Sequence, residues 1–468
     1  MTSPCLRFTT RTSGIGSNVF NLSTPSLRHQ TRTLSASTVS RIPQHSRRTL
    51  RASAPRYNPP TPTTTRTITT TMPPKSAPKA ELPQLNKTPS GPGSGPLPIR
   101  PSSSVILLSP TNQVLLLHRV AKSSSFASAH VFPGGNLSEF HEGDFYPLPK
   151  NGELHKDSEA YRLAAVRETF EESGILLARK KGTGGNGSGG NGDGNEMLVL
   201  SEEELEEGRK EVFGDRIKFG KWLEGKGGVA DIENLHPFTR WITPQNQRKR
   251  FTTQMYLYML PLNTNTSESQ TRTVVQTPTH DGGIEHTAAL FDSPSTWLAK
   301  ASSGEIILYP PQFYLLTLIS RFLPTNHSSN YSEQREKLLS FLRRVPTSSV
   351  KHPTSDIPWA KKVMSPEVVS FAKTGSYGNG RVILGLAKPG HELRDSGRGG
   401  DVERVVLVDF RKEEVEETKE EKTESGVVKK VVKTAMRVPR DLEVVERVEA
   451  MAMAAAPTEK TKGKGSKL

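Results

Sequence analysis

The sequence predicts an α/β fold over residues 102–323, where strand-like and helix-like segments follow one another. Three observations support this. Short apolar runs bounded by turn-forming residues indicate strands, and the stretch 164–177 places its apolar residues at the spacing of one helix face. In that helix Glu168, Glu171 and Glu172 fall within one narrow sector, opposite the apolar stripe, which marks it as the element that carries the chemistry.

A hairpin is expected first. The apolar runs 105–108 and 114–118 are separated by S-P-T-N-Q, a composition typical of a turn between two strands. The helix is then expected to have Asp157 or Ser158 as its N-cap and to stop at Gly174. Ser and Asp suit the N-cap because their side chains accept backbone N–H groups, and glycine suits the residue after the last turn.

The remaining elements follow from the same two patterns. Further strands are expected at 175–177, 236–244, 250–260 and 284–291. A helix is expected to open at Pro310 and to run to about residue 323, since proline suits the first helical turn. Beyond this helix the sequence predicts a small hairpin formed by 381–393 and 405–410. A charged, solvated run is then expected at 413–433.

Composition limits what the rest of the chain can be. Of the 468 residues only 33% are hydrophobic, so much of the chain is not core. The formal net charge is +15, but residues 1–80 hold twelve Lys or Arg and no acidic residue, which leaves +3 for the remainder. A basic leader on a nearly neutral body is typical of an address tag, so no nucleic-acid partner is expected.

Cysteine content and hydropathy exclude further classes. The single cysteine, Cys5, lies in the leader, so the body has no disulfide, no Cys-rich zinc site and no cysteine nucleophile. No apolar run approaches the ~20 residues that a membrane span needs, so no span is expected.

Shifts in composition also predict the domain organisation. Residues 1–71 are rich in Ser, Thr and Arg, which predicts a disordered leader that resembles a mitochondrial presequence. Pro, Lys, Ser and Gly dominate 72–101, which indicates a linker. Within the folded domain, the Gly-rich tract 181–195 is expected to be a flexible inserted loop. Residues 324–468 form a C-terminal extension that we expect to be partly disordered.

The carboxylate-bearing helix carries a motif. The run R-E-T-F-E-E-S-G-I at 167–175 resembles the box of the Nudix hydrolase superfamily, G-x5-E-x7-R-E-U-x-E-E-x-G-U, in which U is apolar. Glu159, eight residues before Arg167, fits the first Glu, and F-P-G-G ending at Gly135 supplies the Gly. Glu159 follows Gly135 by 24 positions instead of six, so an insertion is expected at about 136–155.

A second acidic stretch provides a comparison. The run S-E-E-E-L-E-E-G at 201–208 is equally acidic, but it has no Arg-Glu pair and no F-P-G-G before it. An isolated Glu pair is usually a solvated helix face, so this stretch is interpreted as plain surface.

Four further motifs narrow the resemblance. H-V-F-P-G-G, W-x-T-P, R-F-x-T and P-P-Q-F-Y are similar to the branch of the superfamily that contains the peroxisomal coenzyme A diphosphatases. The similarity covers 102–323. It implies the Nudix fold, an α/β/α sandwich around a mixed sheet with long inserted loops.

The resemblance also implies a metal-dependent site. Glu168, Glu171 and Glu172 would hold Mg²⁺ or Mn²⁺, because small hard cations take several oxygen ligands. Water would then attack one phosphorus of a diphosphate and expel a phosphomonoester. Catalytic roles are expected for Glu171, Glu172, Arg167 and Glu285. Arg167 would orient the glutamates, and Glu285 in D-G-G-I-E-H is the candidate general base, although an ordinary strand-edge Glu fits that pattern equally well.

Substrate-binding roles are expected for Arg119, Gly134 and Gly135. The two glycines would let the chain approach the metal centre closely, although turn glycines would look the same. The coenzyme A subgroup carries L-L-T-x-R-(S/A)-x3-R-x3-G-x3-F-P-G-G. Arg119 fits its first Arg, whereas Ser124 replaces the second Arg and Ser128 the Gly. Serine cannot imitate the bidentate phosphate contact of arginine.

The expected function is therefore hydrolysis of the diphosphate linkage of coenzyme A or acyl-coenzyme A, which gives 3′,5′-ADP and (acyl-)4′-phosphopantetheine. Two alternatives stay open. Another diphosphate, such as ADP-ribose or a dinucleotide, would use the same helix and differ only in the loops. A non-catalytic Nudix-fold binding module is an alternative of a different class, but such a protein would be expected to have lost a metal glutamate.

The two ends of the chain predict different addresses. Ser466, Lys467 and Leu468 form S-K-L, the tripeptide that the peroxisomal import receptor reads. The leader predicts the mitochondrion instead. Translation from Met72 would drop most of the basic leader and keep S-K-L. We therefore expect a peroxisomal form that begins at or near Met72, with a mitochondrial or rare long form.

Overall fold

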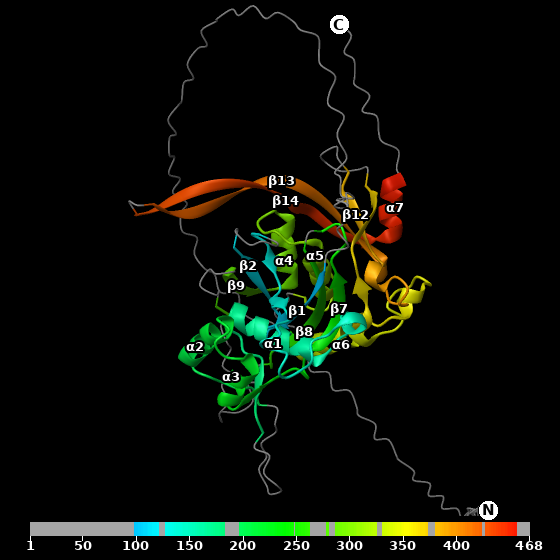
Figure 1. Cartoon of the computed structure of the whole chain (residues 1–468). Helices are drawn as coiled ribbons and strands as arrows, with labels where there is room; N and C mark the ends of the chain where they lie inside the picture. The colour runs from blue at the N-terminus through cyan, green and yellow to red at the C-terminus, as the bar shows by residue number, and fades with distance from the viewer. Residues whose placement is uncertain are drawn as a thin grey trace, which may run out of the picture. The chain divides into compact units, whose positions relative to one another are not determined.

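The computed structural model describes residues 98–120, 127–182, 196–247, 249–262, 278–279, 286–324, 330–372, 380–423 and 426–455 (Figure 1). The expected leader, most of the linker, nearly all of the Gly-rich tract and the S-K-L tripeptide lie outside these residues, so those predictions stay untested. Within the part that is described, no helix is both long and apolar enough to cross a membrane.

An eight-stranded mixed sheet forms the centre of the domain. Its middle strands, β1 (Ile99–Leu108) and β8 (Arg250–Met259), run parallel over their whole length. The strand order is β10-β7-β8-β1-β2-β3, with β4 paired to β1 and β9 paired to β2. The other strands are β2 (Val114–Arg119), β3 (His130–Val131), β4 (Gly134–Asn136), β7 (His236–Ile242), β9 (His286–Asp292) and β10 (Val363–Met364). The predicted hairpin is confirmed as β1 and β2, and β1 starts three residues before the expected domain boundary.

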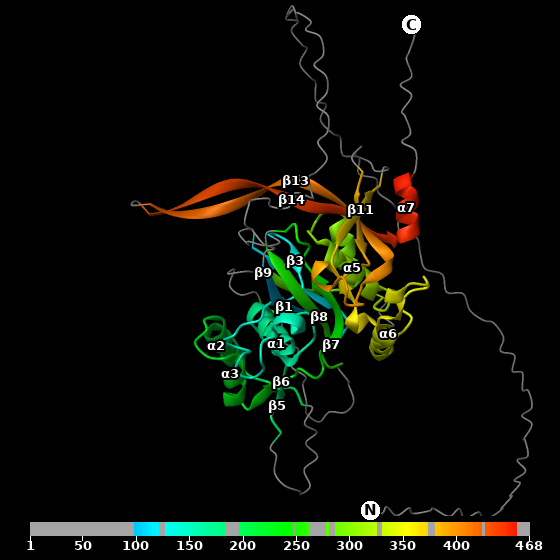
Figure 2. The same ribbon diagram turned by 45° about the vertical axis from the view of Figure 1, so that its right-hand side comes forward.

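Helices cover both faces of this sheet. Ile106 and Leu108 of β1 lie in one buried apolar cluster and Val105 and Leu107 in another, because successive side chains of a strand point to opposite faces. The first cluster contains residues of α4 (Pro294–Ser302), α5 (Pro310–Ser320) and α6 (Tyr331–Arg343). The second contains residues of α1 (Glu159–Ser173), α2 (Glu202–Phe213) and α3 (Phe219–Gly225). The predicted α/β/α sandwich is confirmed (Figures 1 and 2).

Helix α1 begins and ends where the sequence predicted. Ser158 is its N-cap, and Gly174 is its C-cap with φ 72°, in the left-handed region. The Gly174 N–H donates to Phe170 O (2.8 Å), which closes the last turn. A Cβ at this position would lie 2.8 Å from Thr279 Oγ1, so the backbone and its surroundings both require glycine.

The strand predicted at 175–177 is wrong in its position. These three residues are fully buried beside α1 but belong to no strand. The strand β5 (Ala178–Lys180) follows them and pairs with β6 (Gly228–Ala230). The chain enters the apolar cluster directly after the turn at Gly174. Side-chain packing therefore holds these three residues in place, without strand-to-strand backbone hydrogen bonds.

Much of the C-terminal extension is folded. The strands β11 (Glu367–Phe371), β12 (Val382–Leu386), β13 (Asp401–Thr423) and β14 (Gly426–Glu446) form an antiparallel sheet, and α7 (Arg447–Ala455) follows. The predicted small hairpin corresponds to β12 and β13. The run 413–433, predicted as a charged, solvated segment, has the backbone of β13 and β14, which form a long ribbon in Figure 2. These strands were not predicted because so many of their residues are charged that the run shows little apolar periodicity.

The extension also completes the central domain. Strand β10 pairs in parallel with β7, and the Tyr314 hydroxyl of α5 donates to Asp401 Oδ2 (2.6 Å) of β13. Leu386 and Val406 belong to the same apolar cluster as α5. The core therefore continues beyond residue 323, where the sequence placed the end of the domain. Short 3-10 helices lie at Asn151–Glu153, Pro353–Asp356, Trp359–Lys361 and His391–Leu393.

Candidate active site

The two glycines of F-P-G-G bring strand β4 against helix α1. A Cβ on Gly135 would lie 2.5 Å from the carboxylate of Glu168, closer than real Cβ contacts come. Gly134 has φ 153°, and a Cβ there would lie 2.2 Å from Ser103 O of β1. Position 135 therefore requires glycine because a carboxylate fills the space, and position 134 requires it because the sheet backbone fills the space. Gly135 thus lies against Glu168 and Gly134 against Glu172, and their expected role at a metal centre stays a prediction.

Glu172 has a polar neighbour at each carboxylate oxygen. The Gly134 N–H donates to Glu172 Oε2 (2.7 Å). On the other side, His286 Nε2 lies 3.7 Å from Glu172 Oε1, and the imidazole is fully buried. Residues of two strands, β4 and β9, thus lie against this carboxylate from two directions.

Arg167 gathers the other two glutamates. Its Nη1 lies 3.0 Å from Glu168 Oε1 and 3.1 Å from Glu171 Oε1, and its Nη2 donates to Asn136 O (2.9 Å). The guanidinium is almost completely buried. Arg167 therefore lies in contact with two of the three glutamates, and its expected role in orienting them stays a prediction.

A fourth carboxylate, Glu142, belongs to this cluster and was not predicted from the sequence. It has no exposed surface, its Oε1 accepts from Arg167 Nε (2.8 Å), and its Oε2 accepts from the Ser138 N–H (2.5 Å). Glu142 lies in the inserted segment, seven residues after Gly135 and one position beyond the box spacing. Glu159, which had been aligned with the first Glu of the box, lies exposed at the start of α1. The near-match in spacing was the signal that could have identified Glu142.

The carboxylates are buried, although they lie opposite the apolar stripe of α1. Glu171 and Glu172 are each 7% exposed, because the inserted segment and α2 pack over this part of α1. Burial raises the pKa of Glu168 to about 7, although the charge of Arg167 opposes the shift. Burial likewise raises the pKa of Glu171 and of Glu142. Three carboxylates contact the Arg167 guanidinium and Glu172 lies beside them, so the cluster has an excess of negative charge.

The donor set suits a hard divalent cation. Carboxylate oxygens are the ligands that Mg²⁺ and Mn²⁺ prefer, and a cation would offset the excess charge. Among the residues that the structure describes, no three His, Cys, Asp or Glu side chains are arranged to hold a metal ion as they stand. The reason is visible in the contacts, since Arg167 draws Glu168 and Glu171 while Gly134 and His286 hold Glu172. A bound cation would compete with Arg167 for two of its ligands.

The acidic stretch interpreted as plain surface supports the end of α1. Its acidic residues lie mostly at the surface of α2, as expected, but the next residue, Arg209, is buried. Arg209 Nε donates to Glu171 O (2.6 Å), and its Nη1 donates to Thr279 Oγ1 (2.9 Å). The Thr279 N–H in turn donates to Ser173 O (2.9 Å). Helix α2 thereby fixes the turn of α1 that carries the glutamates.

Arg119 lies at the end of β2, opposite His286 of β9 in the sheet register. Since paired residues share a face of the sheet, Arg119 lies on the side of the carboxylates. The candidate base Glu285 and the substituted position Ser124 lie outside the described residues. Ser128 is described, and its φ of 55° places it in the left-handed region that glycine adopts most easily.

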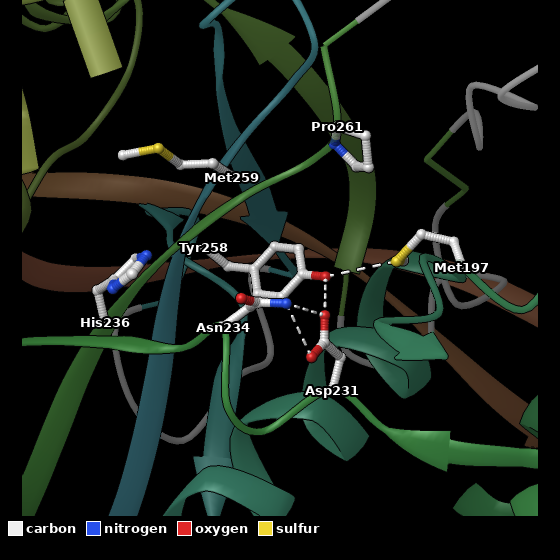
Figure 3. Close-up of a pocket in the computed structure, with 7 residues that line it drawn as sticks. All are labelled: Met197, Asp231, Asn234, His236, Tyr258, Met259 and Pro261. Atoms are coloured by element: carbon white, nitrogen blue, oxygen red, sulfur yellow. Dashed lines mark hydrogen bonds between the residues drawn. The ribbon is translucent and has the colours of Figure 1, made fainter. Parts of the chain in front are cut away.

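A separate pocket lies away from these residues. Its cavity volume is about 190 Å³, and its lining residues are Met197, Asp231, Asn234, His236, Tyr258, Met259 and Pro261 (Figure 3). The Asp231 carboxylate accepts from the Tyr258 hydroxyl (2.8 Å) and from Asn234 Nδ2 (2.9 and 3.1 Å), and it lies 2.8 Å from Arg179 Nε. Asp231, Asn234 and Tyr258 are hydrogen bonded to one another, and no predicted site residue lines this pocket.

Comparison with known proteins places these observations in a family context. Residues 146–319 match the family model described as the NUDT19 Nudix domain. The acyl-coenzyme A diphosphatase NUDT19 of Gallus gallus is 30% identical over 257 residues, which cover 48% of this chain and 65% of that protein. The namesakes from Xenopus laevis and Homo sapiens are 27% and 26% identical and are covered over 63% and 61% of their length. The chain thus spans less than two thirds of these relatives.

Two solved structures are also similar. A NUDIX hydrolase from Alicyclobacillus acidocaldarius is 20% identical with a TM-score of 0.35, over 47% of this chain and 90% of that chain. The MutT protein from Methanosarcina mazei Go1 is 13% identical with a TM-score of 0.25, over 50% and 100%. The family model and the curated relatives confirm the resemblance to Nudix hydrolases of the coenzyme A diphosphatase branch.

Proposed function

We propose that this chain, which has a Nudix fold and resembles the coenzyme A diphosphatases of that superfamily, is a hydrolase that cleaves a diphosphate linkage with the help of a divalent cation. The observation that carries the proposal is the buried cluster on α1: Glu168 and Glu171 contact Arg167, Glu172 lies beside them, and Gly135 has no room for a Cβ against Glu168. A cluster of anions kept out of water costs free energy unless a cation compensates it, so a purely structural role explains it poorly.

The residues have separable tasks. Glu168, Glu171 and Glu172 would hold Mg²⁺ or Mn²⁺, which when bound stabilises charge on the phosphoryl oxygens and makes water easier to deprotonate. Arg167, itself held by Glu142, limits the directions in which Glu168 and Glu171 can point. Water forms a new bond to one phosphorus, the bridging P–O bond breaks, and a phosphomonoester leaves. Glu285 is the proposed acceptor of the proton from water, and Arg119 a proposed phosphate contact.

Coenzyme A or acyl-coenzyme A is the proposed substrate class. The relatives named acyl-coenzyme A diphosphatase support it, and so does Ser128. This serine occupies the glycine position of the coenzyme A pattern and keeps a left-handed backbone there, so the local chain path of that pattern persists without the glycine. The products would be 3′,5′-ADP and (acyl-)4′-phosphopantetheine.

One departure from the coenzyme A pattern supports a second candidate substrate class, other nucleoside diphosphate derivatives. Ser124 stands where the coenzyme A pattern has its second arginine, which removes one bidentate phosphate contact. ADP-ribose or a dinucleotide would use the same glutamates without that contact. A non-catalytic binding module is disfavoured, because the chain keeps all three metal glutamates.

The test is a substrate panel with the full chain. Coenzyme A, an acyl-coenzyme A, ADP-ribose and a dinucleotide are incubated with Mg²⁺ or Mn²⁺, and the products are separated by chromatography. We expect 3′,5′-ADP and 4′-phosphopantetheine from coenzyme A. Release of free coenzyme A from the acyl form as the main product would identify a thioesterase. Turnover of ADP-ribose alone would show that the substrate class is a nucleoside diphosphate sugar and not coenzyme A.

The peroxisomal and mitochondrial addresses stay sequence-based predictions, since the residues that carry them lie outside the described part of the chain.

A further inference from the structure

We propose that His286 is a positioning residue that aims the carboxylate of Glu172 at the metal centre. The inference deepens the proposed function and rests on it. It assigns a role to a buried imidazole that neither the motif nor the expected base includes.

Glu172 differs from its two neighbours in how it is held. Glu168 and Glu171 both lie within 3.1 Å of Arg167 Nη1, so the guanidinium sets their direction. Glu172 instead has Gly134 N–H on Oε2 at 2.7 Å and His286 Nε2 near Oε1 at 3.7 Å. The Gly134 contact is a hydrogen bond, whereas the His286 contact is longer than one, so Glu172 has one firm backbone anchor and one buried polar neighbour.

The fold brings this imidazole to the site. His286 is the first residue of β9 and pairs with Arg119 of β2, at a point where the register shifts between His118 and Arg119. Its side chain has no exposed surface. At 3.7 Å His286 Nε2 lies beyond hydrogen-bond distance of Glu172, so the imidazole acts on this carboxylate through its electrostatic field and its packing, which lower the cost of burying both groups.

Such a partner has a measurable effect on metal binding. Residues that contact a metal ligand without contacting the metal typically contribute 10–100-fold to metal affinity or activity. If His286 aims Glu172, a side chain of similar bulk without a donor weakens the site, whereas an amide in the place of Nε2 preserves it. His286→Phe and His286→Gln provide this pair.

The experiment measures Mn²⁺ affinity directly, by electron paramagnetic resonance of the free ion during titration of the full chain. We expect His286→Phe to weaken Mn²⁺ binding about 10–100-fold and His286→Gln to restore most of it. The matched control is His155→Gln, because His155 is also buried but hydrogen bonds Thr252 and touches no site glutamate. The control should bind Mn²⁺ as the wild type does.

Folding is checked by the melting temperature of each variant. Should His286→Phe fail to fold, His286→Asn takes its place, since its shorter amide reaches less far toward Glu172 and should show the same loss. Wild-type affinity in the folded Phe or Asn variant would overturn the inference, as would an equal loss in His155→Gln. Wild-type protein that binds Mn²⁺ but hydrolyses no diphosphate would refute the proposed function and leave the result for His286 standing.

Discussion

Glu171 sits where the charge of the cluster is shared, beside Arg167 and one turn from Glu168. Glu171→Gln keeps the shape of the side chain and removes one anion from a buried group of like charges, so the fold should be kept. We expect kcat to fall more than about 100-fold, beyond the loss typical of outer-sphere partners. Steady-state kinetics together with a thermal melt provide the measurement, and full activity in a folded variant would contradict the metal assignment.

Glu168 predicts how stability depends on pH in the absence of metal. Burial raises its pKa from 4.5 to about 7, so the folded protein keeps a proton that the unfolded chain loses between these values. The contribution of Glu168 to the free energy of unfolding should therefore fall as the pH rises from 4.5 to 7. His130, His141 and His155 act in the opposite direction, because burial lowers the pKa of each to about 4.

The comparison that isolates this effect is wild type against Glu168→Gln in a chelator, since both proteins share the histidines. The melting temperature of the wild type should decline relative to the variant between pH 4.5 and 7, and added Mg²⁺ or Mn²⁺ should remove that decline. A constant difference across this range would show that Glu168 titrates normally.

At the scale of elements, the contact between β4 and α1 predicts the effect of Gly135→Ala. The new Cβ would meet the Glu168 carboxylate at 2.5 Å, and the flexible side chain would give way before the backbone does. We expect a soluble, folded protein whose kcat falls at least about tenfold, as for other losses of ligand orientation. Gly152→Ala in the same inserted segment is the control, because nothing lies within 4 Å of its Cβ. Equal activity of the two variants would contradict the account.

The elements that carry strong local signals were predictable from sequence. Helix α1 has a cap residue at each end and apolar residues at helical spacing, and its boundaries were confirmed at Glu159 and Ser173. The inserted segment gave no such signal. Its contribution of Glu142 to the site depends on a chain path that no local periodicity encodes, and so does the burial of the carboxylates beneath it.

At the scale of the whole molecule, the sequence placed the end of the domain too early. Residues up to 323 contain the motifs, whereas β10 and the sheet of β11 to β14 have short or highly charged strands with little apolar periodicity. Their membership in the core arises from tertiary contacts, such as Tyr314 to Asp401, and from the packing of Leu386 and Val406 on the cluster around α5. The motifs therefore identified the residues of the candidate site, but they did not identify where the folded domain ends.

This arrangement predicts the result of truncation. A chain that ends at residue 323 would expose the face of α5 that the C-terminal sheet covers and would leave Tyr314 without its carboxylate partner. We expect it to be insoluble or to lack a cooperative melting transition, whereas a chain that ends at residue 455 should melt like the full protein. A soluble, cooperatively folding 1–323 fragment would restore the earlier boundary.

Turnover of coenzyme A in ¹⁸O-labelled water shows whether water attacks a diphosphate phosphorus at the carboxylate cluster of α1. We expect that Mg²⁺ or Mn²⁺ is required, that 3′,5′-ADP and 4′-phosphopantetheine form in equal amounts, and that one of the two carries a single ¹⁸O in its phosphate. Intact coenzyme A under every cation condition, or products without the label, would contradict this mechanism.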